Sequence, residues 1–242
     1  MAGLGFNIAG AVWDSRNVIG SIYPLPSIAT ITLYGSGGPT PVLGSTPSVI
    51  NTPIINANSF IGNSMGGGYD TGVSDSVTKT LMLLCKPSTA GTGKSKGIGT
   101  YTGSGSPIGD TLIFDSTTNR ISSIAGASSG FVQDLVNAEI YDGKFYVVFA
   151  DFALYKTQIF ACKEGGLIAG PGVGLTTRAV PDKTIRIART YESADTSGNA
   201  DIEIAASGIW SGALLTSEQK LQMRNALVSR LGGDYRNRLT LM

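Results

Sequence analysis

One segment near the C-terminus has the periodicity of an amphipathic helix, and its isolation restricts what this chain can fold into. Its apolar residues recur with helical spacing at Leu221, Met223, Leu227, Val228 and Leu231. Thr216 and Gln219 stand just before them as a capping box, in which each side chain can bond the backbone N–H of the other residue. Gly232 and Gly233 follow, where glycine ends a helix at little conformational cost. The sequence therefore predicts a single C-terminal helix on a chain that is otherwise β.

Outside this segment the apolar residues come in short runs that glycine, proline and asparagine interrupt. Residues 201–205 alternate polar with apolar side chains, as a half-buried strand does, and 27–34 alternate in the same way. Further strands are expected at 48–50, 54–61, 79–86, near 101, and at 111–114, 120–124, 144–149, 159–162, 167–169 and 184–188. Residues 133–141 are expected to form either a strand or one helical turn.

The composition agrees with a folded, turn-rich β protein of one domain. Glycine accounts for 33 of 242 residues, nearly twice its usual share, and charged residues for 14%, well below their usual share of about 25%. Apolar residues still make up 42% of the chain, which argues against disorder. All-β sandwiches commonly reach this length without dividing into two domains.

Two of the expected strands, 81–85 and 145–149, are apolar on both faces. In a two-sheet sandwich only one face of a strand looks at the core. The other face must be covered by the C-terminal helix, a long loop or a neighbouring subunit. Because one helix covers only part of a sheet, we expect a homo-oligomer, such as a trimer.

The first 26 residues differ from the rest of the chain. Glycine and proline interrupt an apolar stretch that contains Phe6, Ile8, Val12 and Trp13, and this opposes a regular element. We expect residues 1–26 to be an extended docking arm and 27–242 to be one domain. No run of about 18 apolar residues exists, so no membrane span is expected. The start lacks the basic residues of a secretory signal, so we expect a chain that is either not exported by the general route or already processed.

Charge and residue usage exclude several classes of site. The net charge is +1 and no stretch concentrates lysine and arginine, so a nucleic-acid partner is not expected. The chain has no histidine, which removes the commonest metal ligand and the commonest general base. Cys85 and Cys162 both end apolar runs and are expected to be buried free thiols.

The carboxylates do not form a recognisable catalytic or metal-binding pattern. Asp201 and Glu203 share one strand face about 7 Å apart, a spacing that could suit the acid/base pair of a glycosidase. Some glycosidases built on a β-sandwich place three carboxylates along one strand, and here no third carboxylate completes that pattern. The loop aspartates, which could meet but match no calcium loop, are Asp70, Asp75, Asp110 and Asp115. We therefore expect no catalytic residues, no metal and no cofactor.

A series of sequence blocks over residues 79–231 resembles the concanavalin A-like, laminin-G-like lectin family. The blocks are 79–87, 142–149, 159–169, 184–188 and 201–219, and they stand in the order of that family. Phe145 and Tyr146 replace a tryptophan and a histidine that are frequent in it. The resemblance implies an all-β, concanavalin A-like jelly-roll sandwich with one C-terminal helix, preceded here by an extended N-terminal arm.

Sugar binding in such a domain would use aromatic side chains on loops. Tyr69, Tyr101 and Tyr191 are the candidates for carbohydrate binding, because polar and glycine-bearing sequence surrounds them. Trp210 is expected in the core instead, since it follows Ile209 between the last strand and the helix.

The chain resembles bacteriophage fibre and decoration proteins in three ways: its low charge, its high content of glycine, serine and threonine, and its apolar arm. We therefore expect a non-enzymatic virion structural protein, made in the host cytoplasm, such as a tail-fibre, spike or head-fibre component. Its arm would dock on other virion proteins, and its lectin-like domain would recognise a host-surface glycan. The alternatives are a stand-alone carbohydrate-binding lectin module and, with less support, a glycan-degrading enzyme.

Overall fold

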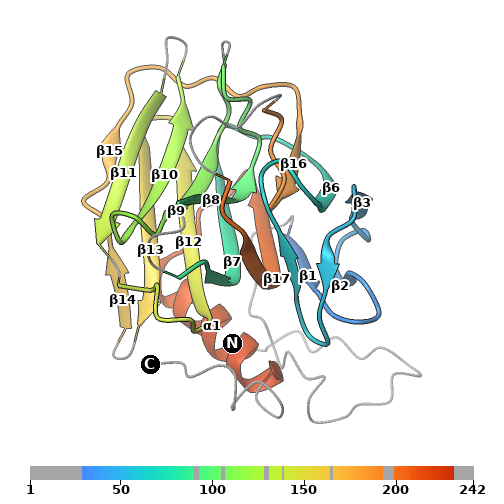
Figure 1. The fold of residues 1–242 in the computed structure, drawn as a ribbon. Coiled ribbons are helices and arrows are strands. Elements are labelled where there is room, and N and C mark those ends of the chain that lie inside the picture. Colours follow the sequence, from blue (N-terminus) through green and yellow to red (C-terminus); the bar gives the residue numbers. More distant parts are fainter. Residues whose placement is uncertain are drawn as a thin grey trace, which may run out of the picture.

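The computed structural model describes residues 29–89, 93–104, 107–127, 131–137, 139–163, 166–192 and 199–231. These residues form two antiparallel sheets that face each other, with one helix outside them (Figure 1). The expected arm residues Phe6, Ile8, Val12 and Trp13 lie outside the described residues, and so do Gly232 and Gly233. The all-β sandwich with a C-terminal helix is confirmed.

The first sheet, sheet A, has its strands in the order β14 (Gly166–Ala169), β13 (Lys156–Lys163), β12 (Tyr146–Ala153), β7 (Lys79–Pro87), β17 (Ile202–Ser211), β1 (Ala29–Leu33) and β2 (Thr40–Leu43). Three short strands extend it: β15 (Val173–Gly174) pairs with β13, β5 (Phe60–Gly62) with β17, and β4 (Ile54–Ile55) with β5. Sheet B has the order β11 (Phe131–Asn137), β10 (Arg120–Gly126), β9 (Thr111–Asp115), β8 (Lys94–Gly99), β16 (Thr184–Ile187), β6 (Gly68–Ser74) and β3 (Ser48–Ile50).

Most of the expected strands are present, with one divided, one absent, and one segment of open assignment found to be a strand. The run 54–61 is divided into β4 and β5 by a turn in which Asn56 N donates to Ser59 O at 2.9 Å. The segment 133–141 is a strand, β11, over most of its length. The prediction of a strand near Tyr101 is wrong, because β8 ends at Gly99 and Tyr101 lies in the loop that follows.

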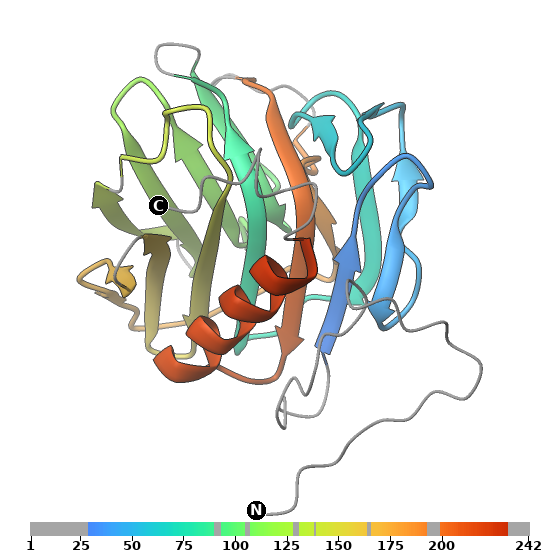
Figure 2. The same ribbon diagram turned by 90° about the horizontal axis from the view of Figure 1, so that it is seen from below.

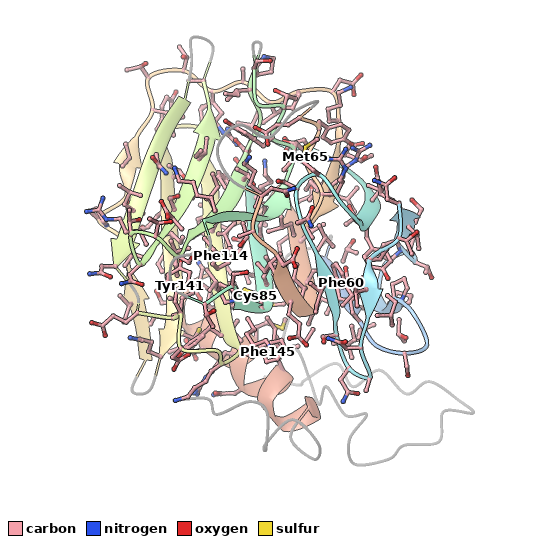
Figure 3. The ribbon with its side chains drawn as sticks, viewed as in Figure 1. Phe60, Met65, Cys85, Phe114, Tyr141 and Phe145 are labelled. Atoms are coloured by element: carbon pink, nitrogen blue, oxygen red, sulfur yellow. The ribbon has the colours of Figure 1, made fainter. Side chains whose placement is uncertain are left out.

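The main core lies between the two sheets. Leu81, Leu83 and Cys85 of β7 pack there with residues of sheet B such as Leu112 and Phe114. Figure 3 shows Cys85 and Phe114 in this interior. At the other side of the core, Tyr34, Phe60 and Tyr69 form an aromatic cluster with ring centroids 4.8 to 5.2 Å apart.

Helix α1 (Ser217–Leu231) crosses the outer face of sheet A, where it lies over β12, β7 and β17 (Figure 2). Its first turn has the expected capping box, with Gln219 Oε1 accepting from Thr216 N at 2.8 Å and Gln219 N donating to Thr216 Oγ1 at 3.2 Å. A second apolar cluster fills the space beneath it: Met82, Leu84, Val147, Phe149, Trp210, Met223 and Leu227 are among its buried residues.

This second cluster changes the argument for self-association. The strands expected to be apolar on both faces, 81–85 and 145–149, also carry side chains that point away from the core between the sheets. These side chains have no exposed surface in a single chain, as at Met82, Val147 and Phe149. These strands therefore do not require a neighbouring subunit to cover them, and the homo-oligomer stays a prediction without this support. The expected core position of Trp210 is confirmed.

The cysteines are buried and free, as expected, on opposite faces of sheet A. Cys85 belongs to the core between the sheets, and Cys162 belongs to the cluster beneath α1. Within the described part of the chain, α1 is too short and too polar to count as a membrane-crossing helix.

Candidate functional site

The outer face of sheet B carries a group of charged and aromatic side chains. Strand β16 places them there, because Ile185 and Ile187 point into the core and leave Thr184 and Arg186 on the outside. Asp70, opposite Arg186 in β6, accepts hydrogen bonds from Thr184 Oγ1 at 2.8 Å and from Arg186 Nε at 3.3 Å. These three side chains therefore form a polar base on this face.

After β16 the chain turns back over this face at Ala188, whose φ is +61°. A residue with a Cβ rarely adopts this left-handed conformation, so surrounding contacts must hold it. Ala188 N donates to Gly97 O at 2.6 Å, and the Ala188 side chain lies against Gly62, where an added Cβ would come within 2.8 Å. Residues 188–192, called the return segment below, are positioned by this turn.

The return segment brings Tyr191 beside Tyr101. Tyr191 N donates to Tyr101 O at 2.9 Å, and the Tyr191 hydroxyl donates to Thr184 O at 3.0 Å. The guanidinium carbon of Arg186 lies 3.5 Å from the centre of the Tyr191 ring, and Lys183 Nζ lies 5.3 Å from it. Arg186 therefore covers a face of the Tyr191 ring.

A buried ion pair lies beneath these two tyrosines. An added Cβ on Gly97 would meet core residues, so its neighbour Lys96 points outward, towards the return segment. There it pairs with Glu192, and the two side chains are only 1% and 7% exposed. Thr190 Oγ1 donates to the same carboxylate at 3.3 Å, and Lys96 Nζ lies 5.3 Å from the Tyr101 ring centre. Glu192 thus has a cation of its own.

Arg189 extends the cationic side of this site. Its Nη1 donates to Ser64 O and lies 3.8 Å from the sulfur of Met65, while its Nε is buried without a hydrogen-bond partner. Burial lowers the pKa of Arg189 and the nearby charge of Arg186 lowers it further, while the charge of Glu192 acts in the opposite direction but does not outweigh them. Met65 lies towards the end of the sandwich away from α1 (Figure 3). We call the following residues the outer site: Asp70, Lys96, Tyr101, Lys183, Arg186, Arg189, Tyr191 and Glu192.

The three tyrosines proposed from the sequence have different positions. Tyr101 and Tyr191 are half-buried and adjacent, although they lie far apart in the sequence. Tyr69 is only 1% exposed and packs between the sheets against Tyr34 and Phe60, so its ring is not on the surface. Carbohydrate binding stays a prediction for the first two.

Comparison with known proteins finds no matching family model and no matching curated protein. It does find solved structures of similar fold. A structure of botulinum neurotoxin type C matches with a TM-score of 0.58 and 14% identity over 82% of this chain. The sialidase of Trypanosoma rangeli, with bound sialic acid, matches with a TM-score of 0.58 and 15% identity over 82% of this chain.

The chain has a lectin-like, jelly-roll β-sandwich fold. It spans about half of the matched neurotoxin structure, 51%, and 32% of the sialidase. At this level of identity the likeness shows the fold alone.

The two carboxylates considered for catalysis are bound by separate partners. Glu203 forms an ion pair with Lys86 and accepts from Ser59 and from Asn56 Nδ2, the latter at 3.0 Å. Burial opposes its ionisation, but these hydrogen bonds and the Lys86 charge outweigh burial and lower its pKa. Asp201 accepts from Asn63 Nδ2 at 2.9 Å instead.

Two of the loop aspartates do meet, but they meet around cations. Lys79 pairs with both Asp75 and Asp110, and Arg178 pairs with Asp110. All four side chains have no exposed surface. Searching the described ranges for three or more His, Cys, Asp or Glu side chains grouped to hold a metal finds no such group. We call Asp75, Lys79, Asp110 and Arg178 the buried quartet. Its two carboxylates are balanced by its two cations.

The cations of the outer site were missed at the sequence level. The run from 183 to 189 carries Lys183, Arg186 and Arg189, which is a visible local excess of positive charge in a chain of low charge. This excess, with Tyr191 two residues further on, is the signal that could have located the site.

Proposed function

We propose that this chain is a non-enzymatic recognition module that binds a glycan on a host surface as part of a bacteriophage virion. The observation that supports glycan binding most directly is the placement of Tyr101 and Tyr191 side by side among charged groups on the outer face of sheet B. Aromatic rings with a polar end, beside fixed charged groups, are suited to sugars, which have apolar faces and polar edges.

The structural neighbours support the same class of function. The matched type C neurotoxin is described as depending on two ganglioside molecules to enter cells, and the matched sialidase holds sialic acid. Both proteins are larger than this chain, so their sugar sites do not carry over to particular residues here. What they support is a sandwich of this kind in a protein that meets cell-surface sugars.

The composition supports the virion assignment. Charged residues are only 14% of the chain and glycine is abundant, as in fibre and decoration proteins. In this proposal the apolar side chains of residues 1–26 dock on other virion proteins, and the lectin-like domain faces outward. A homo-oligomer, such as a trimer, would present several copies of the outer site to one surface and raise its avidity.

The proposal assigns no catalytic step to the chain. A glycosidase needs two carboxyl groups that face each other across the scissile bond. Glu203 is instead engaged by Lys86, Ser59 and Asn56. Release of reducing sugar by the purified chain would favour the glycan-degrading alternative.

Glycan binding is tested by applying the full chain to an oligosaccharide array and repeating the measurement with Tyr101→Ala. We expect binding to fall about tenfold, because stacking and shape both depend on this ring. Tyr155→Ala is the matched control, since Tyr155 is 68% exposed in the turn between β12 and β13. Equal loss in both variants, or no binding by the folded wild type, would contradict the proposal.

The virion assignment is tested by gold-labelled antibody on particles from a phage that carries this gene. We expect label on the particle, and reduced incorporation of the Trp13→Ala chain with unchanged glycan binding. Glycan binding without any label on particles would favour the stand-alone lectin.

A further inference from the structure

We propose that the outer site binds an acidic sugar, whose carboxylate contacts Lys183 and Arg186. This inference rests on the proposed function and names the chemical class of the glycan. It follows from three features of the outer site: the covered ring of Tyr191, the unpaired cations, and the proximity of two guanidinium groups.

The first feature is the ring face that Arg186 covers. A neutral sugar binds an aromatic side chain by laying its C–H face on an open ring face. At Tyr191 the guanidinium carbon of Arg186 is 3.5 Å from the ring centre, so the guanidinium occupies that position. The group presented on this side of Tyr191 is therefore a cation held flat, whose planar set of N–H donors matches a carboxylate.

The second feature is that, among the described residues, the outer site has more cations than available carboxylates. Glu192 is taken by Lys96, and Asp70 is shared between Thr184 and Arg186. Among the described residues, Lys183 and Arg189 form no ion pair, and Asp182 forms none with its neighbour Lys183 although the two are adjacent in sequence. Lys183 is exposed and its ammonium group lies 5.3 Å from the Tyr191 ring centre.

The positions of Lys183 and Arg186 suit one ligand. Both charged groups are near the same ring, so they lie within reach of a single sugar residue. Arg186 Nε already donates to Asp70 and Nη1 to Thr190 O, which fixes the plane of the guanidinium. A carboxylate placed between the two cations would receive a hydrogen bond from a fixed donor and a second one from a flexible lysine.

The third feature is the proximity of Arg186 to Arg189. The two like charges disfavour each other, and this adds to the burial that lowers the pKa of Arg189. Arg189 also keeps a buried Nε without an acceptor. Unpaired buried donors are uncommon and carry a cost. An anion bound nearby would relieve the repulsion, so Arg189 contributes positive potential to the site while Lys183 and Arg186 make the contacts.

The test compares matched sugars that differ only in the carboxylate. The probes are a hyaluronan octasaccharide and its carboxyl-reduced form, and 3′-sialyllactose and its carboxyl-reduced form, each titrated into the full chain at low and physiological salt. We expect the carboxylated member of at least one pair to bind about tenfold more tightly than its neutral counterpart. The preference should shrink as salt rises, because exposed charges are screened.

Two variants locate the site and one controls for net charge. Lys183→Gln removes an exposed ammonium group that has no ion pair, and Arg186→Lys keeps the charge but loses the planar donors. Each should weaken binding of the carboxylated probe about threefold to tenfold, and by more than it weakens binding of the neutral probe. Lys156→Gln, an exposed lysine on β13 of the other sheet, removes the same charge away from the site and should change neither.

The outcomes separate this inference from the proposed function. Equal binding of neutral and carboxylated probes, with no effect of Lys183→Gln, would overturn the acidic-sugar inference while glycan binding stood. Tight binding of the carboxylated probe that survives both site variants would also overturn it, because the site would lie elsewhere. A folded wild type that binds no sugar on the array would overturn both. Circular dichroism of each variant establishes that the fold is intact.

Discussion

Lys220 Nζ donates a hydrogen bond of 2.8 Å to Asp151 Oδ2, which ties helix α1 to strand β12. The same ammonium group donates to Leu215 O, and Thr80 Oγ1 donates to Asp151 Oδ1 at 2.7 Å. Burial raises the pKa of Asp151 and lowers that of Lys220, so each charge depends on the other for compensation. The helix is therefore held on sheet A by a buried polar contact as well as by its apolar face.

Lys220→Met should destabilise the folded chain by about 3–5 kcal/mol, because it leaves Asp151 buried without its cation. The measurement is the free energy of unfolding from a urea titration. Gln222→Ala, on the exposed side of the same helix, is the control and should change it by about 0.5 kcal/mol or less. A Lys220→Met chain as stable as the control would show that the contact does not hold the helix.

Thr216→Ala should cost about 1 kcal/mol, because Gln219 N loses its acceptor at the start of α1. Ser217→Ala, next to it and also exposed, keeps the capping box and is the matched comparison. Urea titration of both variants checks this. Equal losses would mean that the hydrogen bonds of the box contribute nothing beyond a change of helix propensity.

Arg178→Met should destabilise the chain by about 3–5 kcal/mol, since the buried quartet then keeps two carboxylates and only one cation. The exposed pair of Lys163 and Glu139, at 3.4 Å, gives the contrast, because the side chain of Glu139 is 80% exposed. Glu139→Gln should therefore have little effect. Comparable unfolding midpoints for the two variants would contradict the structural role of the quartet.

Acid should destabilise the chain through Glu203 and Asp110. Burial opposes ionisation of both, but hydrogen bonds and nearby cations outweigh it and lower both pKa values. A carboxyl group with a lowered folded pKa stabilises the fold above its unfolded pKa and loses that contribution as pH falls through the folded value. Stability should be level above about pH 5 and fall below the ordinary values of 4.5 and 3.8.

Glu203→Gln should reduce this loss, which unfolding titrations between about pH 2 and pH 7 would measure. Asp151 acts in the opposite direction, because its raised pKa makes its own contribution grow as pH falls. A chain that gains stability throughout the acid range would show that Asp151 dominates, against the prediction.

Both thiols should be unreactive in the folded chain. Burial raises the pKa of Cys162 to about 12 and that of Cys85 well above its ordinary value, so little thiolate forms near neutral pH. Ellman's reagent at about pH 8 should label neither cysteine in native protein and both in guanidinium chloride. Rapid labelling of the native chain would contradict the burial of the two side chains.

The sheets and the helix could be predicted from the sequence because their signals are local. The capping box at Thr216 and the alternation in the last strand each lie within a few residues, and both are confirmed. The two strands that are apolar on both faces were recognised too. Periodicity could not decide whether the helix or a neighbouring subunit covers their outer face. That decision depends on how far α1 extends across sheet A.

The outer site could be predicted only in part, because its residues come from strands and loops that are distant in the sequence. Tyr101 and Tyr191 meet through a backbone hydrogen bond that no local pattern indicates. The prediction that Tyr69 lies on a surface loop was wrong for a related reason. Its glycine-bearing surroundings are typical of a loop, whereas pairing of β6 with β16 and β3 makes it a core residue.

The buried pair of Lys96 and Glu192 has a consequence for how this protein can evolve. Without Lys96 the Glu192 carboxylate would be buried without the cation that it pairs with, so a mutation that removes the charge of Lys96 is tolerated only with a matching mutation at Glu192. Lineages descended from this gene that have lost Lys96 should therefore have exchanged Glu192 for an uncharged residue as well.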